Sequence, residues 1–176
     1  NAVTGAVNIA LKLYDAVTGK TESSTDTSAA NADEAVRKQL LPQAASFDPP
    51  VKADGMQYEY YTGKNADGSV AGYIFTAEAT GYSSVILVNT AVDSKGIITG
   101  VKILAVNDTP GLGTNVQDTA FLNQYKGLSG KVTVTTGTAG TNQVQAVTGA
   151  TVSSSGVTNA VNKALDLYKS LAGGTP

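Results

Sequence analysis

Four runs of strand-forming residues, joined in two pairs by short turns, constrain the fold of this 176-residue chain more than any other feature. The runs are rich in Tyr, Val, Ile and Phe and cover residues 56–62, 70–79, 83–92 and 97–106. Asn-Ala-Asp-Gly at 65–68 predicts a turn in the first pair. Asp-Ser-Lys-Gly at 93–96 fits a type I turn followed by a residue with positive φ. We therefore expect long antiparallel strands in the middle of the chain.

Segments with helical periodicity flank these strands. Apolar residues recur at helical spacing over residues 1–18 and again over 154–171, and glycines follow each segment. The Ser-, Thr-, Asp- and Ala-rich stretch 20–32 is typical of a mobile linker. A short helix is expected over 33–41, where Pro42 would stop it.

Smaller elements complete the expected order. A glycine-rich loop follows Pro110, and the segments after it are predicted as a helix at 116–125 and strands at 131–136 and 143–147. Long antiparallel strands with helices at both ends indicate an α+β fold, in which the N- and C-terminal helices pack on the sheet of a single layered domain.

Composition excludes several classes of function. The chain has no Cys and no His, which argues against disulfides, thiol chemistry, Ser-His nucleophiles and most zinc or haem sites. Its net charge of −2 and the absence of a basic run argue against nucleic acid as a partner. No apolar run reaches the roughly 20 residues of a membrane span, and no signal peptide is present. The start at Asn1 favours a soluble fragment from which a targeting or anchoring segment was removed.

Residues 146–155 carry the clearest chemical signal. A strand-like pair leads into Gly149 and Ala150, and a helix is expected to start soon afterwards. Five hydroxyl side chains surround this step, at Thr148, Thr151, Ser153, Ser154 and Ser155. First-turn N–H groups lack partners inside a helix, so the segment predicts a phosphate site at a helix N-terminus. The alternative is that Ser153 or Ser154 only caps the final helix.

Two motifs in the sequence resemble those of one known family. Thr-Gly-Ala-Thr at 148–151, followed by one residue and Ser-Ser, resembles the flavinylation motif of the FMN-binding domain family. That family includes the G subunit of Rnf electron-transport complexes and the C subunit of the sodium-translocating NADH:quinone reductase. Asn-Asp-Thr-Pro-Gly-Leu-Gly at 107–113 resembles the acidic-Thr-Pro-Gly-Leu-Gly loop of the family. Further similar segments occur in the same order at 40–42 with Phe47, 72–75, 81–82, 98–104 and 121–127, so the likeness covers about residues 33–171.

The resemblance implies a role for each matching residue. Thr151 would be the acceptor whose hydroxyl forms a phosphoester with FMN, transferred by a separate flavin transferase. The residues expected to shape the phosphate pocket are Thr148, Gly149, Ala150 and Ser153. The residues expected to line the isoalloxazine ring are Thr109, Gly111, Leu112 and Gly113. Asp108 is expected to hold the loop rather than to contact the ring. No catalytic residue and no metal ligand is expected.

One position departs from the family pattern. The family usually has Asp six residues before the acceptor Thr, and this chain has Gln145 there. Glutamine keeps a hydrogen-bonding carbonyl but loses the charge. Attachment would be inefficient if the transferase reads that charge, and FMN would then be held without a covalent bond.

The composition also fits an electron carrier better than a stand-alone catalyst. A flavin performs its own redox chemistry, and the protein has to hold the ring and limit its access to solvent. An ordinary Thr hydroxyl needs an adjacent base for activation, and the absence of His favours an external transferase. The Tyr side chains at 58, 60, 61, 73 and 82 are assigned to the sheet surface or core, with packing on the flavin as the minor alternative for one of them.

The resemblance leads to one functional hypothesis and leaves one rival. An N-terminal helix and polar linker (1–32) would precede an FMN-binding domain (33–176) that relays electrons in or near a membrane redox complex. The full-length protein would be extracytoplasmic, either membrane-anchored or secreted, with other subunits or redox proteins as partners. The rival is a secreted or cell-surface binding module of the same fold without covalent flavin.

Overall fold

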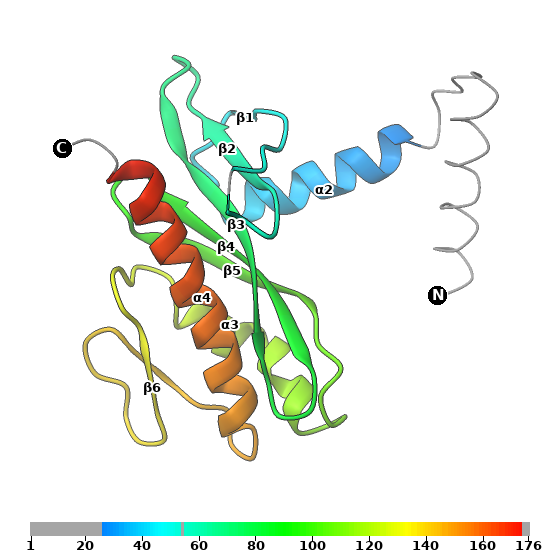
Figure 1. Ribbon diagram of the computed structural model, residues 1–176, viewed down its shortest axis with the longest axis vertical. Coiled ribbons are helices and arrows are strands. Elements are labelled where there is room, and N and C mark those ends of the chain that lie inside the picture. Colours follow the sequence, from blue (N-terminus) through cyan, green and yellow to red (C-terminus); the bar gives the residue numbers. More distant parts are fainter. Residues whose placement is uncertain (1–25, 54, 174–176) are drawn as a thin grey trace. The chain divides into compact units, whose positions relative to one another are not determined.

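Alternating side chains build an antiparallel meander at the centre of the protein. The computed structural model describes residues 26–53 and 55–173 (Figure 1). The strands are β1 (Ser46–Phe47), β2 (Tyr60–Lys64), β3 (Val70–Thr80), β4 (Val85–Asp93) and β5 (Ile98–Ala105). They form one sheet in the order β1-β2-β3-β4-β5, and every neighbouring pair is antiparallel. The antiparallel strands expected from the sequence are therefore confirmed.

Both predicted turns are present, and a glycine with positive φ ends each one. Gly68 has φ +83° and its N–H donates to the Asn65 carbonyl, while Gly96 has φ +84° and donates to the Asp93 carbonyl. The Asp93 side chain strengthens the second turn by accepting the N–H groups of Lys95 and Ile97.

The first predicted strand starts too early. Residues 56–59 lie outside β2, where Gln57 and Tyr58 donate side-chain hydrogen bonds to Glu78 of β3. Their strand-like composition therefore reflects contacts with a neighbouring strand rather than a place in the ladder.

Helix α4 (Thr151–Ala172) packs against β3 and β4 and closes the main core (Figure 1). Its buried stripe includes Val157, Val161 and Leu165, which belong to one apolar cluster with Phe75 and other side chains of the sheet. Leu40, Leu41 and Ala44 form a second, smaller apolar cluster with Ile74 and other sheet residues. The predicted α+β architecture with an antiparallel sheet is confirmed.

Helix α2 (Asp26–Leu40) ends before Pro42 as predicted but begins seven residues earlier than the expected residue 33. The alanines at 29, 30 and 32 are strong helix formers, so the assignment of 26–32 to a mobile linker was wrong. The helix predicted at 1–18 lies outside the described residues, as does the linker up to residue 25. From Val36 onward the chain forms one compact unit.

The segment between the sheet and α4 is more broken than expected. The helix predicted at 116–125 is a 3-10 turn, η1 (Gly113–Gln117), followed by α3 (Thr119–Asn123), because the Asp118 carboxylate caps a new helix by accepting from Ala120 N–H at 2.8 Å. Strands β6 (Thr133–Thr135) and β7 (Gln143–Gln145) form a separate parallel pair. Within the described part of the chain, no helix has both the length and the apolar character needed to cross a membrane.

Candidate functional site

The N-terminus of α4 has no side-chain cap among the described residues. The helix begins at Thr151, and the N-cap position is occupied by Ala150, whose methyl group cannot accept a hydrogen bond. Ser153 instead donates to Asp108 Oδ2 at 2.6 Å, and Ser154 Oγ accepts from Val147 N–H at 3.1 Å. The alternative that Ser153 or Ser154 only caps the helix is therefore wrong. The first-turn N–H groups are free of a cap and can bind an anion.

A type II turn immediately precedes this helix. Ala150 N–H donates to the Val147 carbonyl at 2.9 Å, and Gly149 takes φ +77° at the third position of the turn. Only a residue without Cβ adopts this conformation at no steric cost. The turn leaves the Thr151 side chain exposed at the first helical position.

A second type II turn lies next to the first. Leu112 N–H donates to the Thr109 carbonyl at 3.2 Å, with Pro110 at the second position and Gly111 at φ +75° in the third. The Asn115 amide donates to the Gly111 carbonyl at 2.8 Å and braces the turn. Leu112 is 50% exposed, and a Cβ placed on Gly149 would lie 3.1 Å from Leu112 Cδ2. The two turns therefore approach each other across an apolar side chain.

Asp108 ties the surrounding loops together from a buried position, with only 2% of its surface exposed. Its carboxylate accepts the backbone N–H groups of Tyr82, Ser83 and Ser84 at 2.8–3.0 Å, and also the hydroxyls of Ser84 and Ser153. Burial opposes ionisation, but these donors outweigh it and hold the pKa of Asp108 well below its usual range. The prediction that Asp108 holds the loop is confirmed.

One cavity of about 530 Å³ opens between these segments. It is lined by seven of the predicted site residues: Thr109, Leu112, Gly113, Gly149, Ala150, Thr151 and Ser153. Thr148 and Gly111 do not line it, although each belongs to one of the two turns. Ser153 lines the wall, but its hydroxyl is already used by Asp108.

Two residues of the cavity wall were missed by sequence reasoning. Tyr82 is 70% exposed and reaches the cavity because Asp108 binds its backbone N–H. The Gly81-Tyr82 pair belonged to the family likeness, so a signal existed, and the minor alternative that one tyrosine packs on the flavin fits Tyr82 better than a place in the sheet. Val152, beside the acceptor position, is half exposed and carried no signal of its own.

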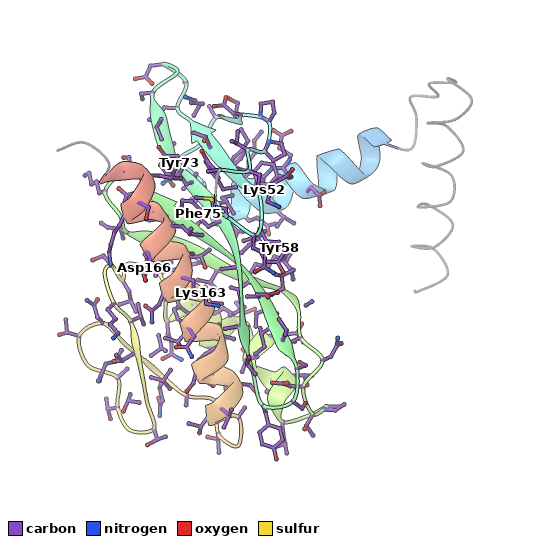
Figure 2. The ribbon with its side chains drawn as sticks, in the orientation of Figure 1. Lys52, Tyr58, Tyr73, Phe75, Lys163 and Asp166 are labelled. Carbon is purple, nitrogen blue, oxygen red and sulfur yellow. The ribbon has the colours of Figure 1, made fainter. Side chains whose placement is uncertain are left out.

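Two other cavities contain none of the predicted site residues. The larger, of about 380 Å³, lies between the end of α2, β5 and α3. The smaller, of about 290 Å³, lies between residues 55–58, β3 and α4, where Figure 2 labels Tyr58, Lys163 and Asp166. Its polar groups are largely engaged: Tyr58 donates to the Glu78 carboxylate, and Lys163 Nζ donates to the Glu78 carbonyl at 2.8 Å.

Gln145, the position that departs from the family pattern, lies on β7 with its side chain exposed. The Gln124 side-chain amide clamps its backbone, accepting from Gln145 N–H at 2.6 Å and donating to its carbonyl at 3.2 Å. The strand that leads to the Thr148–Thr151 turn is thus fixed in place, and the side chain at 145 faces outward.

The cavity combines apolar surface with an anion-binding helix N-terminus. The cavity volume lies within the roughly 300–1,000 Å³ of small-molecule sites. Leu112, Val152 and Tyr82 offer apolar surface for a ring, and the uncapped first turn of α4 offers N–H donors for phosphate oxygens.

Comparison with known proteins identifies a family with this geometry. A profile described as the FMN-binding domain matches residues 81–166, which include the whole of the cavity wall. The chain is 35% identical to the G subunit of the Na⁺-translocating ferredoxin:NAD⁺ oxidoreductase complex of Acetobacterium woodii, over 77% of this chain and 73% of that protein. It is 34% identical to the G subunit of the ion-translocating oxidoreductase complex of Methanosarcina acetivorans, over 77% of this chain and 74% of that protein.

A solved structure shows the same fold. The C subunit of the Na⁺-translocating NADH-quinone reductase from Parabacteroides distasonis superposes with a TM-score of 0.61 at 19% identity, covering 88% of this chain and all of that chain. The family likeness drawn from residues 107–113 and 148–151 is confirmed by the profile and the relatives together. This chain is similar in sequence to the G subunits of ion-translocating oxidoreductase complexes. It belongs to the FMN-binding domain family, and its cofactor is FMN.

Proposed function

We propose that this chain is an extracytoplasmic electron-relay domain whose FMN is joined through its phosphate to Oγ of Thr151. The observation that carries the proposal is the place of Thr151. Its exposed side chain stands at the first position of an uncapped helix and lines the same cavity as Leu112. A phosphate bound to that oxygen lies at the helix N-terminus, and the flavin ring then has the cavity beside it.

The residues of the cavity divide into two groups by the part of FMN they hold. The first turn of α4 donates N–H groups to the phosphate, and Gly149 lets the backbone approach it closely. Leu112 and Tyr82 pack on the ring and exclude water from part of it. When bound, FMN supplies the redox chemistry, and the protein contributes orientation and electrostatics.

Attachment requires a separate flavin transferase. In the transfer, the Thr151 oxygen would form a bond to the FMN phosphorus of a flavin dinucleotide donor as the phosphoanhydride bond breaks. The leaving group would be a nucleoside monophosphate, and a base would take the hydroxyl proton. The net addition to the protein is FMN minus one water. His is absent from the chain and no Lys lines the cavity among the described residues, so the base has to come from the transferase.

The relatives support a setting within an ion-translocating electron-transport complex. Two proteins at least 34% identical to this chain are G subunits of ion-translocating oxidoreductase complexes. We assign this chain the same kind of setting: a domain held at the outer side of the membrane, with other proteins of an electron-transport complex as donor and acceptor.

Intact-mass measurement after co-expression with a flavin transferase tests the attachment. Wild type gains the mass of FMN minus one water, and Thr151→Ala does not. Ser155→Ala is the matched control, because the Ser155 hydroxyl lies one helical turn from Thr151 but outside the cavity wall and outside the Thr148–Ser154 motif, so this variant should still be modified. Modification that persists in Thr151→Ala overturns the assignment of the acceptor. A wild type that gains no mass and binds no flavin favours the binding-module rival.

A further inference from the structure

The cavity assigned to FMN holds no cationic side chain for the phosphate. Its wall is formed by Tyr82, Thr109, Leu112, Gly113, Gly149, Ala150, Thr151, Val152 and Ser153. Lys and Arg are absent from this wall as far as the structure describes it, and the chain has no His. Proteins that bind free phosphate groups commonly place Arg or Lys against them. The positive end of α4 is therefore the main attraction for an anion in this wall.

A fixed negative charge lies directly behind that wall. The Asp108 carboxylate accepts the hydroxyl of Ser153, which is in the first turn of α4. A Cβ on Gly113 would lie 2.5 Å from Asp108 Cβ, so the Asp108 side chain packs directly against this residue of the cavity wall. Asp108 remains ionised at neutral pH: burial alone would raise its pKa, but its hydrogen-bond donors outweigh burial and hold the pKa well below the usual range.

The balance of charges opposes a doubly charged ligand. A helix N-terminus is equivalent to about +0.5 elementary charge. One ionised carboxylate within a helical turn of the N-terminus opposes that contribution and makes the site less attractive to a doubly charged phosphate. Free FMN is a phosphate monoester with a charge of about −1.5 to −2 at pH 7. An FMN that is esterified to a Thr hydroxyl is a diester and carries a single charge.

We propose that this cavity selects against the free phosphate of FMN and accepts the singly charged, ester-linked form, with Asp108 as the residue that sets the preference. The inference rests on the proposed attachment at Thr151, but it concerns reversible binding. Covalent attachment then overcomes a repulsion that would leave the free cofactor weakly held.

The test compares FMN with riboflavin, which has the same ring and no phosphate. Apoprotein from a host without a flavin transferase is titrated with each compound, and binding is followed by flavin fluorescence. We expect wild type to bind riboflavin at least as tightly as FMN. FMN binding tenfold or more tightly than riboflavin overturns the proposal. Failure of both compounds to bind also overturns it, because neutral riboflavin escapes the charge penalty.

Two variants test whether the Asp108 charge causes the weak preference for FMN. Asp108→Asn removes the buried charge and should shift the affinity ratio toward FMN by about tenfold, equivalent to roughly 1.4 kcal/mol. Ser84→Ala is its control, because it removes one side-chain hydrogen bond to Asp108, keeps the charge and lies outside the cavity wall, so the affinity ratio should stay near that of wild type.

Val152→Lys tests the same idea without touching the buried network. Val152 is half exposed on the cavity wall, so a lysine there folds in place and should shift the ratio toward FMN by about threefold relative to Val152→Gln. Unchanged ratios in both Asp108→Asn and Val152→Lys contradict the proposal. The mass measurement at Thr151 remains independent of all these outcomes, so failure here leaves the attachment hypothesis standing.

Discussion

Two buried polar side chains of this protein have opposite surroundings. Asp108 is 2% exposed and accepts hydrogen bonds from Ser153 and from three consecutive backbone N–H groups. Thr90 is fully buried on β4, and its hydroxyl has no hydrogen-bond partner among the described residues. A satisfied buried charge holds a structure together, whereas an unsatisfied hydroxyl destabilises it.

Thr90→Val should therefore stabilise the fold. Valine has the shape of threonine and removes the unpaired hydroxyl, so we expect the free energy of unfolding to rise by about 1 kcal/mol. Thr76→Val on the neighbouring strand is the matched control, because the Thr76 hydroxyl donates to the Asn89 side chain at 2.8 Å. This variant loses a hydrogen bond, so its free energy of unfolding should fall or stay unchanged. Urea unfolding measures both variants. A loss of stability in Thr90→Val equal to that of Thr76→Val would show that the Thr90 hydroxyl has a partner.

Asp108 predicts a defined dependence of stability on pH. Its pKa is lowered in the folded protein from an unfolded value of about 3.9, so its contribution is present above that pH and is lost as the pH falls below it. At pH 7 we expect Asp108→Asn to cost about 3 kcal/mol, because the backbone donors of residues 82–84 lose a charged acceptor. At pH 3 the difference in free energy of unfolding between Asp108→Asn and wild type should be clearly smaller. Denaturant unfolding at both pH values measures it, and a difference that does not depend on pH contradicts an ionised Asp108.

At the scale of elements, local chemistry predicted most boundaries and tertiary contacts decided the rest. The turns at 65–68 and 93–96 were predictable because each needs its terminal glycine. The predicted start of α4 is three residues late because Ser153 and Ser154 resemble caps. Their hydroxyls are used by Asp108, 45 residues away, and by the backbone of Val147. Partners so distant in sequence leave no local signal. The role of Tyr82 was difficult to predict for the same reason, because Asp108 binds its backbone N–H from 26 residues away.

The contact between α4 and the end of β3 depends on Gly156. A Cβ at this position would lie 2.7 Å from the Thr80 carbonyl and 3.0 Å from Gly81 Cα, and both are backbone atoms that cannot rotate away. Alanine normally favours a helix over glycine by about 1 kcal/mol. We nevertheless expect Gly156→Ala to destabilise the protein by about 1–3 kcal/mol, because the helix has to move off the sheet. Asn159→Ala, at an exposed position of the same helix, is the control and should be neutral or slightly stabilising.

Thermal unfolding of Gly156→Ala and Asn159→Ala separates the effect of helix propensity from the effect of the close contact with β3. If Gly156→Ala proves as stable as Asn159→Ala, then the helix and strand do not approach as closely as described.

At the scale of the whole molecule, the site joins three segments that lie far apart in the chain. Residues 81–84, 108–113 and 147–153 meet around one cavity, and Asp108 connects the first segment to the third. Each of the last two segments could be named from the sequence because its motif resembles that of the FMN-binding domain family. That these segments meet around one cavity could not be predicted from the sequence, because it depends on the packing of α4 against β3 and β4.

This convergence makes a prediction about the flavin-loaded protein. A ring that is tethered at Thr151 and packed against Leu112 and Tyr82 contacts all three segments, so it should slow amide hydrogen exchange in all three together. Exchange in β6 and β7 should not change, because neither strand lines the cavity. Thr151→Ala, co-expressed with the same transferase, should keep the exchange pattern of the unloaded protein. Protection limited to residues 147–153 would mean that the ring extends into solvent, and the cavity would then hold only the phosphate.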